Sequence, residues 1–122
     1  MSRNFILSCF FLFLYSCTPP AYKAGDIYSI DDGAEKFSVV KVLAVDNEMI
    51  HIRIYKQKFS SRPSSVDPKI LTLGTPSDSD GFGIGHIPLD KNAFKEWEPE
   101  LIMNIPVTED ELEGYKMWKE NQ

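Results

Sequence analysis

KFSVVKVLAVDNEMIHIRIYKQKF, residues 36–59, contains two runs rich in β-branched side chains, separated by a polar break at residues 46–48. In the second run Ile50, Ile52 and Ile54 alternate with His51, Arg53 and Tyr55. Because side chains alternate between the faces of a strand, the isoleucines should share one face and the polar residues a face open to water. We predict a long β-hairpin with strands at 37–45 and 49–58.

The first arm of this hairpin differs from the second, because both of its faces are apolar. Phe37, Val39, Leu43 and Val45 have one parity, and the other parity is apolar as well over residues 40–44. A strand of this kind is covered on both sides, either because a small sheet bends over itself or because a helix lies on its back.

Further strands are predicted at 26–30, 70–73, 82–89 and 101–105, with exposed loops at 60–68 and 74–81. An Asp-Gly step at Asp32 and Gly33 predicts the turn between the first strand and the hairpin. This pattern of short strands around a bent hairpin resembles the architecture of SH3-like small barrels. The expected fold is therefore mostly β, either an SH3-like small antiparallel barrel or a bent meander of five to six strands, plus two short C-terminal helices.

Both helices have clear start signals. Asp90 is a good N-cap for a helix that should end near Trp97, because Pro99 disfavours helical structure in the residue before it. Thr108 and Glu111 form a capping box for a second helix over 109–119. One stripe of this second helix is apolar and should pack on the barrel, namely Leu112, Tyr115 and Trp118.

The N-terminal segment is typical of an export signal, with Arg3 followed by an apolar run of about 11 residues, too short to span a membrane. The run ends in Leu14-Tyr15-Ser16-Cys17, which resembles the lipobox of bacterial lipoprotein precursors. The resemblance implies a signal peptide at 1–16, a lipidated Cys17 with a tether at 17–24, and a single β-rich domain at 25–122. The alternatives are an uncleaved apolar anchor and an ordinary signal peptide.

The lipobox resemblance also implies a location. A lipidated cysteine carries enough acyl chains for stable attachment to a membrane, and Thr18 after it favours the outer membrane of a Gram-negative cell, facing the periplasm. Without residues 1–16 the chain keeps 106 residues, with 12 Lys and Arg against 18 Asp and Glu and no cysteine except Cys17. An acidic balance of this kind argues against nucleic acid as a partner.

Few residues of the chain match known sets for catalysis or for metal and cofactor binding. The glycines at 81, 83 and 85 lack the spacing of the dinucleotide motif, and we expect them to allow a sharp bend or a close approach of strands. Asp78 and Asp80 lie in a calcium-loop-like segment without its end ligands. We predict no metal, no cofactor and no catalytic residue. An alternative is a hydrolase in which His86 acts as a base beside Asp78 or Asp80.

The end of the hairpin and the two loops at 60–68 and 74–81 are the candidate partner site. We predict a recognition surface of Tyr55, Lys58, Phe59, Arg62 and Phe82, with aromatic anchors and charges that set orientation. The alternative is that the phenylalanines point into the core and the lysines protect a strand edge. The predicted function is a non-enzymatic, lipid-anchored binding module with a protein partner in the envelope. An immunity or inhibitor lipoprotein that masks the basic surface of a toxin is the alternative within binding.

Overall fold

The computed structural model describes residues 21–122, so the predicted signal peptide and Cys17 lie outside the described residues. Five antiparallel strands form one bent, open sheet in the order β4-β3-β2-β1-β5. The mostly β fold with short C-terminal helices is therefore confirmed. The elements are β1 (Asp26–Asp31), β2 (Phe37–Val45), β3 (Met49–Phe59), η1 (Pro68–Ile70), β4 (Ile84–Asp90), α2 (Lys91–Glu96), β5 (Glu100–Asn104), η2 (Asp110–Leu112) and α3 (Glu113–Glu120).

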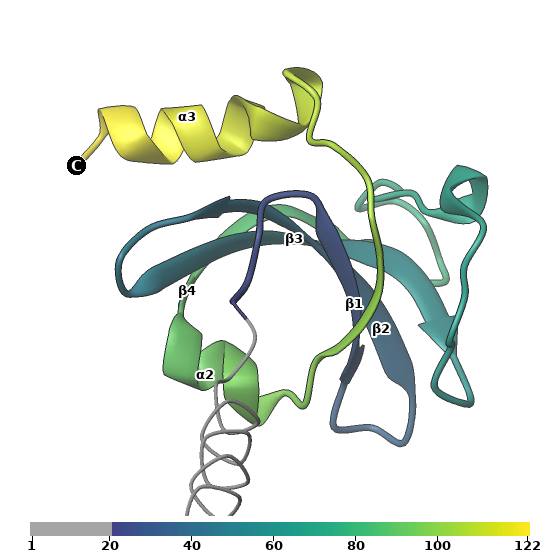
Figure 1. The fold of residues 1–122 in the computed structure, drawn as a ribbon. Coiled ribbons are helices and arrows are strands. Elements are labelled where there is room, and N and C mark those ends of the chain that lie inside the picture. The colour runs from purple at the N-terminus through teal and green to yellow at the C-terminus, as the bar shows by residue number, and fades with distance from the viewer. Residues whose placement is uncertain (1–20) are drawn as a thin grey trace, which may run out of the picture.

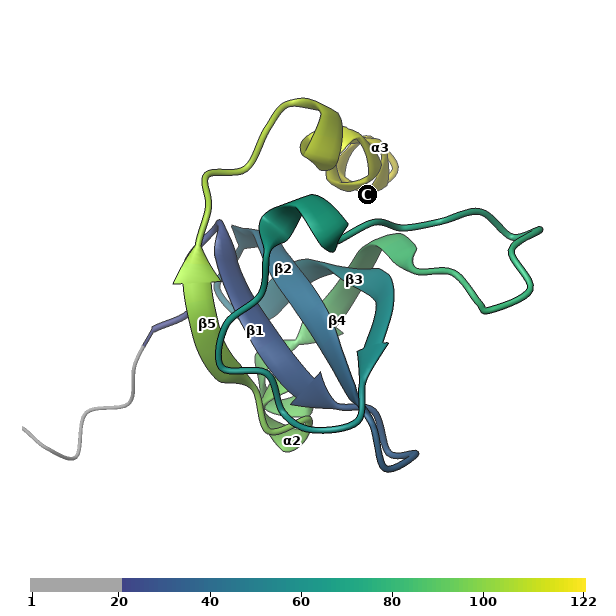
Figure 2. The same cartoon turned by 90° about the vertical axis from the view of Figure 1, so that its right-hand side faces the viewer.

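The β2–β3 hairpin is the centre of the sheet, as its sequence predicts. Its register pairs Val42 with Ile52, and the pairing shifts on either side of this point, between Ser38 and Val40 and between Val42 and Ala44. Such irregularities bend a strand and increase its twist. Figure 1 shows the resulting curvature of the sheet. Figure 2 shows β5 beside β1 at one edge of the sheet, and the loop before β4 extending away from the sheet.

The two helices cover opposite sides of the sheet (Figure 1). On the α2 side, Phe94 is fully buried in the main apolar cluster, which the even-numbered residues of the hairpin help to form. Asp90 caps α2 as predicted, since its side chain accepts a hydrogen bond from Asn92 N, and the helix ends at Glu96 with Trp97 as its C-cap. The buried residues of this cluster are Tyr28, Ile30, Val40, Val42, Ile50, Ile52 and Phe94.

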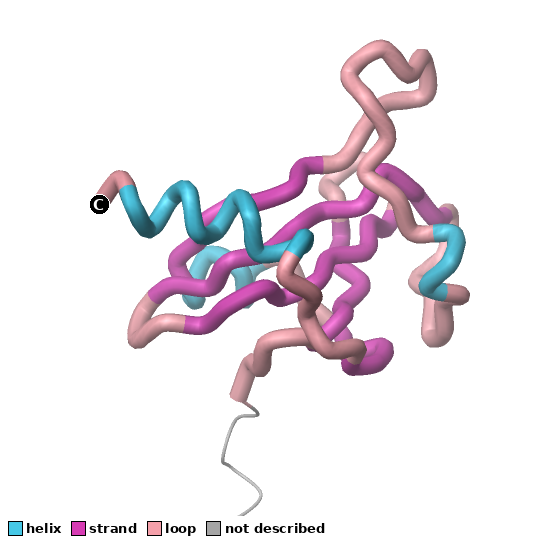
Figure 3. Tube along the Cα trace, turned by 90° about the horizontal axis from the view of Figure 1, so that it is seen from above, coloured by secondary structure: helices cyan, strands magenta, loops and turns pink. Residues whose placement is uncertain are grey.

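The other face of β3 is covered, and its predicted exposure to water is wrong. His51 is fully buried, and Tyr55 is only 8% exposed in a second apolar cluster with Ile27, Val39 and Val66. The helix α3 lies over the strands on this side, as seen from above in Figure 3. Burial on both faces, predicted for β2 alone, thus extends to β3 because a segment far along the chain returns to cover it.

Two further expectations about local structure need correction. Residues 70–73 form no strand: Ile70 ends the short helix η1 and is 48% exposed. Asp67 caps this helix by accepting a hydrogen bond from Lys69 N, and Pro68 suits its first position, so the start of the apolar run is a helical turn. Only isolated hydrogen bonds, such as Lys56 N to Thr72 O, join the rest of the run to β3. The last helix also differs, because its first turn is the separate 3₁₀ helix η2 and α3 follows from Glu113.

The domain begins before residue 25, the boundary predicted from the sequence. Tyr22 packs edge-on against Tyr28 and Phe94, with ring centroids 5.8 and 5.3 Å away. Lys23 N donates a hydrogen bond to Asp26, whose carboxylate also accepts from the Tyr28 hydroxyl. Residues 22–24 thus contact the folded domain, with Tyr22 on its α2 side.

Candidate functional site

The α3 side of the sheet contains an unusual set of buried polar side chains. Lys41 on β2 is 3% exposed, and His51 on β3 is fully buried. Arg53 lies two residues after His51, so it is on the same face of β3. Burying charged or polar groups is costly unless each group finds a partner, and two clusters provide these partners. We call them the histidine chain (Asp46, His51 and His86) and the cation cluster (Lys41, Arg53 and Glu111).

The histidine chain runs across the sheet from the β2–β3 turn to β4. Asp46 Oδ2 lies 3.0 Å from His51 Nε2, and His51 Nδ1 lies 3.0 Å from His86 Nε2. A carboxylate only accepts hydrogen bonds, so neutral His51 must carry its proton on Nε2 and accept on Nδ1. We therefore assign the proton of neutral His86 to Nε2, from which it donates to His51.

Aromatic side chains of α3 cover the histidine chain. The rings of Tyr115 and Trp118 lie 4.6 and 4.7 Å from the His51 ring, centroid to centroid. Gly114 allows this close approach, since a Cβ at that position would lie 2.8 Å from the Cβ of His86. Burial and the neighbouring His51 both lower the pKa of His86 below its usual value. A proton added to His86 is therefore unfavourable while α3 is packed.

The cation cluster joins the C-terminal segment to the sheet. Lys41 Nζ donates to both carboxylate oxygens of Glu111, at 2.9 and 3.1 Å, and to Pro106 O at 3.3 Å. Burial acts to raise the pKa of Glu111, but hydrogen bonds from Thr108 N and Lys41 outweigh it, so this pKa is lowered. Glu111 also completes the predicted capping box with Thr108, which is confirmed. One carboxylate thus starts the last helical segment and pairs with a buried lysine.

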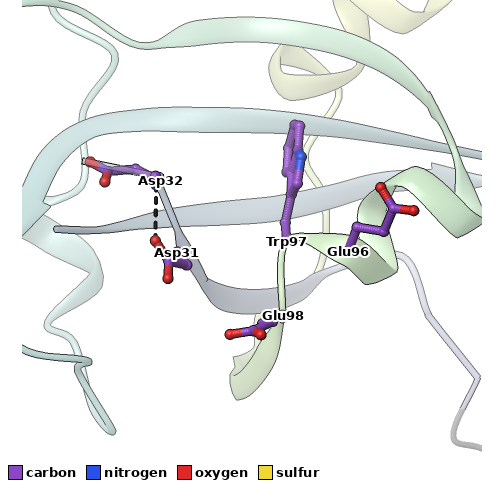
Figure 4. A pocket seen from close by; sticks show the side chains of 6 residues that line it. Asp31, Asp32, Glu96, Trp97 and Glu98 are labelled. Atoms are coloured by element: carbon purple, nitrogen blue, oxygen red, sulfur yellow. Dashed lines mark hydrogen bonds between the residues drawn. The ribbon is translucent and has the colours of Figure 1, made fainter. Parts of the chain in front are cut away.

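A cavity of about 340 Å³ lies on the other side of the sheet, at the end of β1 (Figure 4). Its lining is acidic, with Asp31 and Asp32 on one side and Glu96 and Glu98 on the other, while the Trp97 ring between them packs toward the core. The pKa of Asp32 is lowered, chiefly by the hydrogen bond from Ala34 N. A concave acidic surface next to an indole ring is suited to a basic side chain.

The structure does not bring the five predicted recognition residues together on one surface. Tyr55 is in the second apolar cluster and Phe59 packs against it, whereas Phe82 is 54% exposed. Lys58 is half-exposed and contacts Ser38 and Asp32. Phe82 and Lys58 are therefore the members of the set that are most accessible to a partner.

Arg62 is more deeply embedded than the sequence suggests. Its Nη1 donates to Ser29 O, Ser29 Oγ and Glu98 O, at 2.9 to 3.1 Å. Its guanidinium also lies over the Phe37 ring, 4.8 Å from the centroid. These contacts attach the loop at 60–68 to β1, so Arg62 is chiefly a structural residue.

The carboxylates predicted to lie beside His86 are elsewhere. Lys56 Nζ contacts Asp78 at 3.0 Å and Asp80 at 2.8 Å, and Thr75 N together with Lys56 lowers the pKa of Asp78 to about 2. The acid in the histidine chain is Asp46, which the sequence reasoning missed. Its signal was available, since Asp46 and His51 flank one tight turn and hairpin pairing brings such positions close.

Of the three glycines at 81, 83 and 85, Gly83 allows the predicted close approach of strands. A Cβ at Gly83 would overlap the carbonyl oxygen of Ile54, so β4 can follow β3 only with glycine at this position.

Among residues 21–122, no group of three or more His, Cys, Asp or Glu side chains could hold a metal ion. No helix in this described part is long and apolar enough to cross a membrane. Comparison with protein-family models, curated proteins and solved structures finds no match to the chain.

Proposed function

We propose that the protein is a lipid-anchored interaction module of a bacterial cell envelope, attached through Cys17 and holding a protein partner without catalysing a reaction. The lipobox-like residues 14–17 support the anchor. The observation that carries the proposal is the packing of Tyr22 against Tyr28 and Phe94. It leaves only residues 18–21 between the lipidated cysteine and the folded domain.

This short connection determines which side of the domain faces the membrane. Five Cα steps from Cys17 to Tyr22 span at most about 18 Å when fully extended. The α2 side, which Tyr22 joins, is therefore next to the bilayer. The opposite side, with α3 and both buried polar clusters, faces away from the membrane and is available to a partner (Figure 1). We place the attachment in the outer membrane, facing the periplasm.

Metabolic labelling with a fatty-acid probe tests the anchor. The wild-type protein should incorporate the probe, and Cys17→Ala should not. Equal labelling of the two proteins would refute the anchor.

Vesicles containing the lipidated protein test its orientation. The mature chain has no other cysteine, so Lys95→Cys on α2 and Lys116→Cys on α3 each give one site for a fluorophore. A quencher in the lipid headgroups should reduce the signal at residue 95 more than at residue 116. Equal quenching would contradict the proposed orientation.

Crosslinking in intact envelopes tests the partner. A photoreactive residue at Lys116, on α3, should capture a protein that the same residue at Lys95 does not capture. Capture from residue 95 alone would place the binding surface on the α2 side and contradict the proposal.

One observation favours the inhibitor alternative as a second candidate. The acidic cavity around Trp97 could receive a basic side chain of a toxin (Figure 4). If a toxin is encoded beside this gene, charge reversal at the cavity wall, Glu96→Lys with Glu98→Lys, should abolish protection against that toxin. Full protection by this variant would exclude the acidic cavity as the inhibitory surface.

A further inference from the structure

A second cavity lies beneath the C-terminal segment, between the sheet, η1 and the chain that follows β5. Its volume is about 280 Å³. Apolar side chains of Ile27, Leu71 and Ile105 form part of its wall, and Lys41, Arg53 and Glu111 provide the charges. A small cavity with an apolar wall and a few convergent polar groups has the general character of a ligand site.

The charges in this cavity do not balance. Two cations face a single carboxylate, and the contacts of Lys41 already involve both oxygens of Glu111. The nearest approach of Arg53 to Glu111 is 3.7 Å from Nη1 to Oε2, which is too long for a hydrogen bond. Arg53 is therefore the cation without a close carboxylate contact, and the Tyr55 hydroxyl is its other polar neighbour.

The position of the Arg53 guanidinium indicates where the missing acceptor would bind. Its Nε is buried without a hydrogen-bond partner, although the side chain as a whole keeps 16% of its exposure. Arg53 is also one of the residues that line the cavity, so its guanidinium is within reach of a ligand bound there. A guanidinium in this position favours a carboxylate, because its paired N–H groups match the two oxygens.

We propose that this cavity binds one carboxylate group carried on a short apolar body. The carboxylate accepts hydrogen bonds from the Nη groups of Arg53, and the apolar body contacts Leu71 and Ile105. The excess of one positive charge suits a monoanion, whereas Glu111 in the wall repels a dianion such as phosphate. The cavity is slightly smaller than the roughly 300 Å³ at which typical ligand pockets begin, so the apolar body must be only a few carbons long.

This chemistry has two sources, a free short-chain acid or the C-terminal carboxylate of a peptide that ends in a small apolar residue. Neither source depends on the lipid anchor, so failure of this proposal leaves the proposed function untouched.

Calorimetry with the detergent-solubilised full chain tests the proposal. Butyrate should bind. Butyramide has the same shape without the charge, and its dissociation constant should be at least about tenfold larger. A peptide ending in alanine, compared with its C-terminal amide, distinguishes the two sources. Equal binding of butyrate and butyramide, or binding of neither butyrate nor the free-acid peptide, would overturn the proposal.

Two variants locate the site. Arg53→Gln removes the proposed carboxylate-binding group, and Leu71→Trp fills the cavity while leaving all of its charges in place. Both should weaken butyrate binding about tenfold or more. Lys95→Gln, which removes one exposed charge from α2, is the matched control and should bind butyrate as wild type does. If Arg53→Gln does not fold, Leu71→Trp decides the question, because undiminished binding to a folded Leu71→Trp protein would overturn the assignment.

Discussion

The two faces of the sheet differ in what they bury: one is apolar throughout, and the other combines a second apolar cluster with buried polar groups. On the α2 side Phe94 lies in a continuous apolar cluster of aliphatic and aromatic residues. On the α3 side the covering segment contacts Lys41, Arg53 and His51, and Glu111 and aromatic rings provide the partners. An apolar interface is stable with any well-packed neighbour, whereas buried charges are tolerated only with particular partners in particular positions.

This difference suggests a division of roles between the faces. Hydrophobic burial on the α2 side supplies free energy of folding in proportion to the area removed from water. Buried ion pairs contribute little net stability compared with apolar residues of the same volume, yet breaking one is costly. The α3 side therefore contributes mainly by fixing one position of the C-terminal segment, and with it the cavity beneath that segment.

The largest expected effect tests the apolar side. Phe94→Ala should lower the free energy of unfolding by about 3–5 kcal/mol, the range for removing a large aromatic ring from a core. Chemical denaturation measures this change. Met117→Ala on α3 is the control, because Met117 is 59% exposed and its truncation should stay within about 0.5 kcal/mol. Similar losses in the two variants would show that the main core is not on the α2 side.

A smaller effect tests the charged side. Glu111→Gln keeps the shape of the side chain but leaves Lys41 buried without a counter-charge, so we expect a loss of about 3 kcal/mol. Glu109→Gln is the matched control, because its ion pair with Lys116 is exposed and should leave the denaturation midpoint unchanged. If the two variants behave alike, the cation cluster does not hold the C-terminal segment.

The sequence predicted those features of the fold that depend on neighbouring residues. The alternation of Ile50, Ile52 and Ile54 specified the hairpin, and the capping residues Asp90 and Thr108 marked where helical turns begin. The same local view failed for residues 70–73, where the cap at Asp67 redirects an apolar run that would otherwise suit a strand.

The candidate site could be predicted only in part, because its residues come from distant segments. The amphipathic stripe of Tyr115 and Trp118 predicted that the last helix packs on the sheet, but not on which face. His51 and Arg53 therefore appeared to face water. Glu111 was identified as a capping residue, and its second role, pairing with Lys41 seventy positions earlier, has no local signal.

Within the histidine chain, His86 is the residue expected to make the stability of the α3 side depend on pH. His86 is held by His51, beneath Tyr115 and Trp118 of α3, and Asp46 faces the far nitrogen of His51. Lys119 lies over the Tyr115 ring and is a further positive charge close to this group. A proton on His86 would add a charge to a covered site that already contains another imidazole. The folded protein therefore binds that proton less readily than the unfolded chain does.

The last and smallest effect follows from the sign of this shift. Burial, and then His51, lowers the pKa of His86 in the folded protein, so the unfolded chain binds the proton first as pH falls below about 6.5. The stability contributed by neutral His86 is complete above that pH and is lost as pH falls toward the folded pKa. The free energy of unfolding then changes by at most about 1.4 kcal/mol per pH unit, the value for one proton.

Denaturation midpoints measured between pH 7.5 and 5.5 should therefore decrease in the wild type and change less in His86→Gln. Carboxylates titrate mainly below this range, so they do not mask the effect. An equal decrease in both proteins would mean that the pH response arises elsewhere, and that α3 is held by its aromatic contacts whether or not His86 is protonated.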